Sequence, residues 1–301
     1  MNLKGWTALI QERFPPLSYG PMILVFCLAN LTPNGILSKI YWLRILLVLI
    51  LGFSYFLRLR LFDEIKDLDT DLAVNPRRPL ARGAISVDEV KLGIFFLIVL
   101  EGLLFAIFAN GSWPFWLAPL GFSLLMYNEF FISKWIRPHL TRYAVSHTFV
   151  SVFMGLSLWA FAAHATRVYT FESMLFFLSN WALFNLFEFA RKTFAPKEER
   201  KSVESYSKVF GLWGACFLSF SQLSIFILLV NRSWTSSWAI DFQSPIGRIY
   251  MALLSIYALC CLGFSVKKSV SSAKFFRAIS GLLLLASYSM IIYYSLLGVK
   301  P

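Results

Sequence analysis

The sequence predicts an all-α membrane protein that crosses the bilayer several times. Its mean hydropathy is +0.65, and 58% of its 301 residues are hydrophobic while 15% are charged. This composition excludes an ordinary soluble domain. The apolar residues form separate runs of about 17–25 residues, which is the length that an α-helix needs to cross a bilayer.

Nine apolar runs follow a short amphipathic segment. Within residues 1–20, Trp6 and Phe14 are mixed with the charged Lys4, which predicts a short helix that lies in the membrane interface and ends at the prolines at positions 15 and 16. We expect residues 21–301 to form a single transmembrane domain. The predicted spans cover residues 21–38, 41–57, 91–110, 113–131, 143–163, 170–190, 209–230, 246–264 and 278–297.

The basic residues are distributed unevenly between the two predicted sides of the membrane. With the N-terminus in the cytoplasm, 22 of the 28 Lys and Arg residues fall on the cytoplasmic side. Cytoplasmic loops of membrane proteins carry such an excess. We therefore predict a cytoplasmic N-terminus and an outer C-terminus in a bacterial inner membrane, although an organelle membrane fits equally. The net charge of +12 then indicates contact with anionic lipid and diphosphate headgroups rather than with nucleic acid.

Five of the 16 acidic residues gather within nine positions after the second predicted span, in RLFDEIKDLDTD. Asp63, Asp67 and Asp71 are spaced by four residues, which on a helix places them along one stripe. Such a cluster at the end of a membrane helix repels itself and needs a cation. Carboxylate oxygens suit Mg²⁺, whose shell is usually completed by water and substrate phosphates. The stripe therefore predicts a Mg²⁺ site for a phosphate-bearing substrate.

Arginines follow this acidic cluster directly, in NPRRPLARGAIS. Two prolines and a glycine favour a turn in this segment. Arg78 and its neighbours Arg77 and Arg82 can each bind phosphate oxygens through two parallel hydrogen bonds. A metal ion held by the acids and a diphosphate held by the arginines form a coherent assembly. The alternative is that the acids and arginines form ion pairs with one another.

These two segments together resemble the first motif of the UbiA superfamily of intramembrane prenyltransferases, an NDxxDxxxD pattern followed by a segment similar to NRPLxxGxIS. Asp63 stands at the position of the family's Asn, and Glu64 stands at its first Asp. Asp67 and Asp71 match the pattern directly. The resemblance implies about nine helices around a central cavity with a Mg²⁺ site that binds an isoprenyl diphosphate. The implied metal ligands are Asp63, Glu64, Asp67 and Asp71, and the implied diphosphate ligands include Arg78.

The family's second acidic motif, a DxxxD-like element after the sixth helix, is less well preserved. The corresponding segment, FEFARKTFAPKEERKSVESYSKVFG, contains no Asp and is net basic. The resemblance makes Glu188 the best candidate for a further metal ligand, because it lies at the end of a predicted span. Its alternative role is an ion pair with Arg191 or Lys192, one helical turn away. This departure leaves open the number of metal ions and the reaction performed.

The connection after the fourth span holds further candidates. The family places basic residues near here, so the resemblance implies that Lys134 and Arg137 bind the diphosphate; the alternative is that they only set the membrane orientation. Glu129 lies just inside the span, and an ionisable residue within a span is a candidate functional residue. We predict that Glu129 orients an acceptor or acts as a base, with Glu101 as its partner. The alternative is a structural hydrogen bond between helices.

The resemblance implies Mg²⁺-dependent transfer of an isoprenyl group to an aromatic or lipid acceptor within the membrane, by ionisation of the diphosphate and capture of the carbocation. The catalytic residues would be Asp67, Asp71 and Glu129. One alternative is a UbiA-type terpene cyclase, in which the substrate's own double bonds attack the cation. A second alternative is a non-catalytic transporter or lipid-binding protein. A transporter should carry broken helices around polar groups at the midplane, whereas the polar residues here gather at one face.

Overall fold

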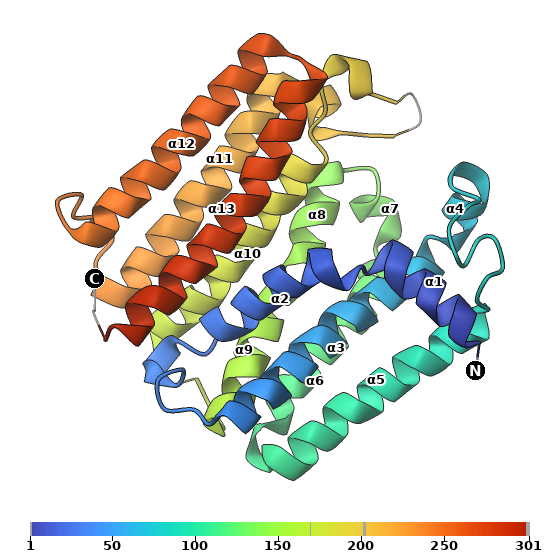
Figure 1. Cartoon of the computed structure of the whole chain (residues 1–301), viewed down its shortest axis with the longest axis horizontal. Helices are drawn as coiled ribbons and strands as arrows, with labels where there is room; N and C mark the ends of the chain where they lie inside the picture. Colours follow the sequence, from blue (N-terminus) through green and yellow to red (C-terminus); the bar gives the residue numbers. More distant parts are fainter. Residues whose placement is uncertain (1, 169, 201–202, 299–301) are drawn as a thin grey trace.

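The computed structural model describes residues 2–168, 170–200 and 203–298, and within these residues every regular element is a helix (Figure 1). The predicted all-α membrane fold is therefore confirmed. Seven helical segments of the described chain are long and apolar enough to cross a membrane. They are α3 (Trp42–Lys66), α5 (Val87–Phe108), α8 with α9 (Leu140–Thr148 and Val150–Ala163), α10 (Phe171–Arg191), α11 (Tyr206–Thr235), α12 (Pro245–Lys267) and α13 (Val270–Leu296).

The predicted count of nine spans is not confirmed, because two of the nine apolar runs form shorter helices. α2 (Pro16–Ala29) has 14 residues, about 21 Å of helix against about 30 Å of bilayer core. It ends early because a proline starts the 3₁₀ turn η1 (Pro33–Gly35), in which Asn34 is left-handed. α6 (Trp113–Tyr127) ends before η3 (Glu129–Phe131), whose three residues have φ angles of 50°, 55° and 59°.

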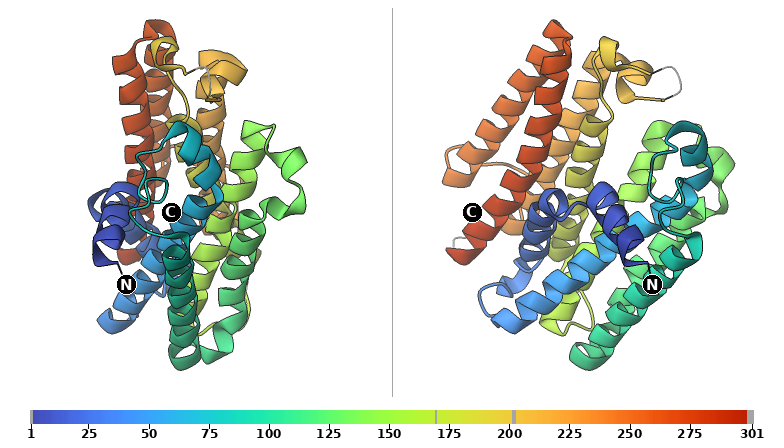
Figure 2. Two further views of the ribbon diagram at one scale, coloured as in Figure 1. Left: turned by 90° about the vertical axis from the view of Figure 1, so that its right-hand side faces the viewer. Right: turned by 45° about the vertical axis from the view of Figure 1, so that its right-hand side comes forward.

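Five helices pack into a closed ring, and further helices lie outside it. Neighbouring contacts run from α2 to α3, α9, α10, α13 and back to α2. α5 and α6 cover the α3–α9 side, and α11 and α12 cover the α10–α13 side. Figure 2 shows from two further directions that α10 to α13 run side by side, apart from α3, α5 and α6. This arrangement leaves α3, α6, α8 and α10 around a common space, where the acidic motif of α3 ends.

The first helix, α1 (Leu3–Arg13), is fastened to the segment that carries the acidic motif. Arg13 Nε donates to Glu64 Oε1 at 2.7 Å, and Arg82 Nη2 donates to Glu12 Oε1 at 2.6 Å. The Glu12 carboxylate accepts hydrogen bonds from Arg82, which lowers its pKa. The helix predicted before the two prolines is thus present, and its position in the membrane interface stays a prediction.

An ion pair between α3 and α5 lies inside the helix bundle. Arg58 Nε is 3.0 Å from Glu101 Oε1, and the two side chains are 1% and 0% exposed. Glu101 also accepts from Ser54 Oγ at 2.8 Å and Trp116 Nε1 at 3.2 Å, while Arg58 donates to Ser123 Oγ. Buried charges require pairing and hydrogen bonding of this kind. We refer to these five residues as the buried ion-pair cluster.

Candidate active site

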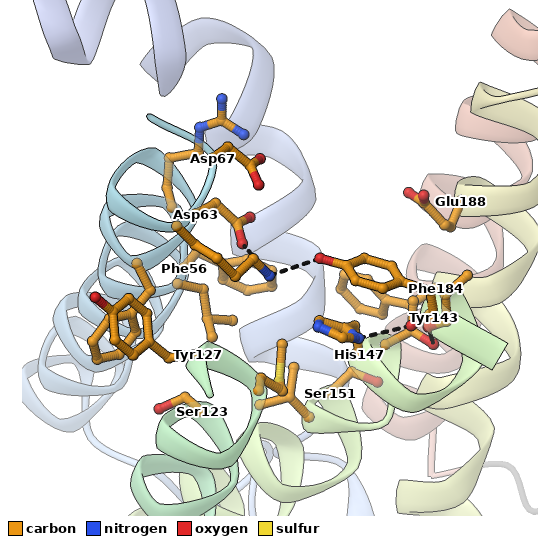
Figure 3. A pocket seen from close by; sticks show the side chains of 18 of the residues that line it. Phe56, Asp63, Asp67, Ser123, Tyr127, Tyr143, His147, Ser151, Phe184 and Glu188 are labelled. Carbon is orange, nitrogen blue, oxygen red and sulfur yellow. Dashed lines mark hydrogen bonds and ion pairs between the residues drawn. The ribbon is translucent and has the colours of Figure 1, made fainter. Parts of the chain in front are cut away.

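A cavity of about 390 Å³ lies among α3, α6, α8, α9 and α10 (Figure 3). Charged side chains gather along one part of its wall, and aromatic, apolar and hydroxyl side chains line the remainder. Its acidic lining residues are Asp63, Asp67 and Glu188, and its basic lining residues are Arg13, Arg60, Lys66, Arg78, Arg191 and Lys192.

The acidic stripe bends at its middle residue. α3 ends before Asp67, which has φ −89° and ψ 1°, and α4 (Leu68–Val74) begins directly after it. The helical hydrogen-bond spacing nevertheless continues, because Asp67 N donates to Asp63 O at 2.9 Å and Asp71 N donates to Asp67 O at 2.8 Å. Asp63 and Asp67 therefore stay together on the cavity wall. Asp71 is buried on the far side of the bend.

Two acids of the motif lie behind the cavity wall and form ion pairs with arginines of the wall. Asp71 accepts hydrogen bonds from Arg78 Nη1 on both carboxylate oxygens, at 2.5 and 2.6 Å. Glu64, which is 1% exposed, contacts Arg13 at 2.7 Å and Arg60 at 2.8 Å. All three arginines line the cavity. Asp71 and Glu64 thus orient cavity arginines in this structure, and their predicted metal binding stays a prediction.

Glu188 reaches the cavity from α10, opposite Asp63 and Asp67 in Figure 3. Its carboxylate lies 2.5 Å from Arg191 Nη2 and 2.9 Å from Lys192 Nζ. The ion pair that was the alternative reading of Glu188 is therefore present at a position that also faces the motif acids. The fold brings one acid of the second motif segment and two acids of the first to the same cavity.

Lys66 and Tyr143 connect the two sides of the site and were absent from the predicted set. Lys66 Nζ donates to the Tyr143 hydroxyl at 2.7 Å and lies 3.7 Å from Asp63 Oδ1. The Lys66 side chain is 8% exposed, so this amine is oriented by its neighbours rather than by water. Its position three residues after Asp63 was the available signal. Tyr143 carries no comparable signal, because its helix is distant in sequence.

His147 and Ser151 line the cavity next to this pair (Figure 3). The His147 ring stacks on the Tyr143 ring with centroids 3.9 Å apart and planes 17° apart. Among the described residues, neither His147 Nε2 nor Ser151 Oγ has a hydrogen-bond partner, although both atoms are buried. A buried polar group without a partner costs about 1–3 kcal/mol, so these two atoms are candidates for contact with a ligand.

The remaining predicted residues lie away from the cavity. Glu129 is buried and pairs with Arg137 at 2.6 Å, while the Arg137 side chain is 65% exposed. The hydrogen bond to Glu129 raises the pKa of Arg137. The expected pairing of Glu129 with Glu101 is not found, since Glu101 belongs to the buried ion-pair cluster. Lys134 is exposed and does not line the cavity.

The donor set on the cavity wall fits Mg²⁺ that is shared with a substrate. Asp63, Asp67 and Glu188 offer hard carboxylate oxygens from two sides. Within the described ranges no three acidic, His or Cys side chains converge closely enough to hold a metal ion by themselves. Mg²⁺ commonly uses one or two carboxylates together with water and substrate phosphates. The pKa of Asp67 is raised, because desolvation and the nearby Asp71 both raise it while Lys66 lowers it. A bound cation would favour the ionised carboxylate.

Seven helical segments of membrane-spanning length, with a cavity whose wall is partly charged, define an integral membrane protein with a candidate ligand site. No protein-family model and no curated protein sequence matches the chain. Two solved structures share its fold. One, from work on digeranylgeranylglyceryl phosphate synthase in membranes, has a TM-score of 0.64 and 14% sequence identity and covers 98% of this chain and 99% of that chain. The other, an apo UbiA homologue from Aeropyrum pernix K1, has a TM-score of 0.59 and 14% identity and covers 89% and 97%.

At 14% identity these comparisons establish the fold. The chain has the architecture of the UbiA-type prenyltransferase structures over nearly its whole length. The resemblance first drawn from the segment around residues 63–86 is confirmed at this level.

Proposed function

We propose that the protein transfers an isoprenyl group from an isoprenyl diphosphate to an acceptor within the membrane, with Mg²⁺ as cofactor. The observation that carries this proposal is the meeting of Asp63 of α3 and Asp67, which follows α3 directly, with Glu188 of α10 at one cavity. The fold shared with UbiA-type structures supports the same reaction class. The solved neighbour that concerns digeranylgeranylglyceryl phosphate synthase favours a lipid as acceptor, and an aromatic acceptor remains the alternative.

The basic residues of the wall would hold the diphosphate. Lys66, Arg78, Arg191 and Lys192 all line the cavity beside the acids, and arginine and lysine bind phosphate oxygens strongly. Mg²⁺, when bound, would neutralise charge that grows on the departing diphosphate. Asp71 would act by holding Arg78 in place. The predicted roles of Glu64 in metal binding, of Lys134 and Arg137 in diphosphate binding, and of Glu129 toward the acceptor stay predictions.

The apolar part of the wall would receive the isoprenoid and protect its cation. Phe56 and Phe184 stack there with ring centroids 5.9 Å apart. Aromatic faces attract cations, most strongly where water is excluded. Met126 and Met154 complete an unbranched, adaptable surface beside them. This lining supports ionisation of an allylic diphosphate and is compatible with either transfer or cyclisation.

We further propose that the charged wall lies on the cytoplasmic side of the membrane. The distribution of basic residues supports this orientation, because it favours the same side for the N-terminus, the acidic motif and the segment after Glu188. An isoprenyl diphosphate would then approach with its headgroup on the cytoplasmic side and its tail in the bilayer.

Asp67→Ala tests the proposal, with Asp69→Ala as its matched control. Asp69 lies two residues away in α4, is exposed and does not line the cavity. Purified protein in lipid nanodiscs would be given Mg²⁺ and isoprenyl diphosphates of increasing length, and diphosphate release and organic products would be measured. We expect Asp67→Ala to lower release about 10²–10³-fold, and Asp69→Ala to leave it unchanged, with equal thermal stability for both variants.

The products separate the proposal from its rivals. A product that joins the isoprenyl group to an added acceptor supports prenyl transfer. A cyclic hydrocarbon or terpene alcohol formed without acceptor would identify a terpene cyclase instead. Wild-type protein that releases no diphosphate from an isoprenyl diphosphate of any chain length would contradict both prenyl transfer and cyclisation. Full activity of Asp67→Ala would contradict the proposed metal site.

A further inference from the structure

We propose that His147, assisted by Ser151, binds a hydroxyl group of the acceptor and takes its proton as the new bond forms. This inference rests on the proposed prenyl transfer and adds the chemical class of the acceptor, namely a molecule that presents a hydroxyl group as nucleophile. The function proposed above uses neither residue. Both line the cavity, and each carries a buried polar atom without a partner in the described chain.

The tautomer of His147 follows from its one backbone contact. Nδ1 lies 2.8 Å from the carbonyl oxygen of Tyr143. A carbonyl can only accept, so Nδ1 carries the proton in the neutral ring and donates it to this oxygen. Nε2 then presents a lone pair, which makes it an acceptor of hydrogen bonds and a base. It can be satisfied by a ligand O–H group.

The orientation of the ring is fixed by packing as well. Tyr143 stacks on one face at 3.9 Å, and Phe130 meets the ring edge-on with centroids 5.8 Å apart. Tyr143 is itself held by the hydrogen bond from Lys66. In Figure 3 the ring edge away from the Tyr143 carbonyl faces the space between α3 and α8. A base that is held in this way needs no rearrangement to meet its substrate.

His147 also lies at the right distance along the cavity for this role. The reacting carbon of an isoprenyl diphosphate is bonded directly to the diphosphate oxygen. A base for the acceptor must therefore stand beside the charged wall and not at the end of the tail pocket. His147 meets this condition, because Tyr143 alone separates it from Lys66, and Lys66 lies 3.7 Å from Asp63.

Ser151 lies one helical turn beyond His147, across the break between α8 and α9 at Phe149. Its hydroxyl is buried on the same wall and has no partner in the part of the chain that the structure describes. A serine hydroxyl both donates and accepts. It can therefore donate to a lone pair of the acceptor oxygen while that oxygen gives its proton to His147.

The reaction balances with these groups alone. The bond between the allylic carbon and the diphosphate oxygen breaks, and its electron pair leaves on the diphosphate. The acceptor oxygen supplies the pair for the new C–O bond, and its proton moves to His147 Nε2. The imidazolium returns this proton to solvent after the products leave. The step needs neither an oxidant nor a reductant.

His147→Gln tests the inference, because glutamine keeps polarity at the position but is no base. The matched control is His139→Gln, since His139 is exposed, lies two turns earlier and does not line the cavity. The donor would be geranylgeranyl diphosphate with Mg²⁺. The acceptor probes would be a 1-O-alkylglycerol and 4-hydroxybenzoate. The first would be compared with its 2,3-di-O-methyl ether and the second with its 4-methyl ether, because neither ether has a hydroxyl proton.

We expect wild-type protein and His139→Gln to form product with a hydroxyl probe and to form none with its methyl ether. His147→Gln should lower this product formation about 100-fold, since a positioned base contributes about 10²–10⁴-fold. Diphosphate release without acceptor should fall much less than product formation, because the metal and diphosphate residues are intact. Ser151→Ala should show a smaller loss of the same kind.

A pH profile gives a second readout. Transfer by wild-type protein should fall at low pH as His147 takes up a proton, and this acidic limb should be absent from the residual activity of His147→Gln. The charged or titratable groups around the ring are Lys66 of α3, Glu129 of η3, Tyr143 of α8 and Lys192 after α10. Their variants would be profiled alongside to assign the limb.

Three results would overturn the inference. His147→Gln could match wild type with the hydroxyl probes, the methyl ethers could react equally well, or wild-type protein could release diphosphate with no stimulation by either hydroxyl probe. Absence of diphosphate release by wild-type protein would instead overturn the function proposed above. Loss of acceptor-free release in His147→Gln, with normal thermal stability, would assign His147 to diphosphate ionisation and so contradict its role toward the acceptor.

Discussion

Helix α3 carries two groups of charge, at Arg58 and at Asp63, about one and a half turns apart, and they are built in opposite ways. In the buried ion-pair cluster, Arg58 and Glu101 are at most 1% exposed and find every partner within the protein. At the cavity, Asp63 is 46% exposed, and the neighbouring His147 Nε2 has no partner in the described chain. The difference indicates that charged side chains are structural where the protein supplies all their ion-pair and hydrogen-bond partners. Where it does not, they are available for a ligand.

The largest stability effect expected from this comparison is at Glu101. Glu101→Ala would leave the Arg58 guanidinium buried without its counter-charge, which costs about 3–5 kcal/mol. Replacing both partners, as Arg58→Met with Glu101→Leu, should recover most of that loss. Unfolding in detergent, followed by circular dichroism, measures both. Diphosphate release per folded molecule should stay near wild type in the double variant.

Glu172→Ala is the matched control for this prediction. Glu172 pairs with Arg232 at 3.0 Å, but its side chain is 32% exposed, and such pairs contribute about 0–1 kcal/mol. Equal destabilisation by Glu101→Ala and Glu172→Ala would show that enclosure of the buried ion-pair cluster contributes nothing, and the contrast between the two charge groups of α3 would fail.

Lys66→Gln should affect the ligand rather than the fold. Hydrogen bonds to charged groups contribute about 1.5–3 kcal/mol, so the affinity for isoprenyl diphosphate should fall about 10- to 100-fold. Tyr143→Phe removes only the oxygen that Lys66 contacts. Its effect should be smaller, because it keeps the ring beside His147. Binding of a non-hydrolysable isoprenyl diphosphate analogue measures both. Unchanged affinity with a loss of thermal stability would place Lys66 among the structural charges.

The smallest effect expected is at Glu198, outside the membrane-spanning segments. Its carboxylate lies 2.7 Å from Arg277 Nη2, and the hydrogen bond from Arg277 lowers the pKa of Glu198 below 4.5. A lowered pKa in the folded state stabilises the protein above the unfolded value of 4.5 and loses this contribution as pH falls through the folded value. Glu198→Gln should cost about 1 kcal/mol at neutral pH.

Thermal midpoints compared at pH 7 and at the lowest pH that the protein tolerates check the sign for Glu198. The difference between wild type and Glu198→Gln should shrink at the lower pH. A difference that grows on acidification would be opposite to the direction given by the ion pair with Arg277.

The helical membrane fold could be predicted because apolar runs of bilayer length dominate the sequence. The number of spans could not, because two runs are cut short by local backbone geometry. Asn34 and the three residues of η3 adopt left-handed conformations, which a pattern of apolar residues does not predict. These positions depend on how the chain packs at its turns.

The candidate site could be predicted only in part, because tertiary packing decides which side chains meet there. The spacing of Asp63 and Asp67 and the resemblance at Glu188 identified three acids that do line the cavity. The ion pair of Asp71 with Arg78 agrees with the alternative that the acids and the following arginines pair with one another. Neither spacing nor resemblance indicated that Glu64 would face Arg13, which approaches it from a helix 51 residues earlier. Tyr143 and His147 come from another helix, and tertiary packing alone brings them to the site.

The contacts of α1 also bear on how the chain is made. This helix is synthesised well before its partners, which lie far downstream: Arg13 contacts Glu64, Glu12 contacts Arg82, and Asn2 N donates to Glu89 Oε1. The first of these contacts cannot form before Glu64 has been synthesised, and the last waits for Glu89. The charged wall of the cavity, which combines Arg13 of α1 with Asp63 of α3 and Glu188 of α10, is therefore assembled from segments that are synthesised at widely separated times.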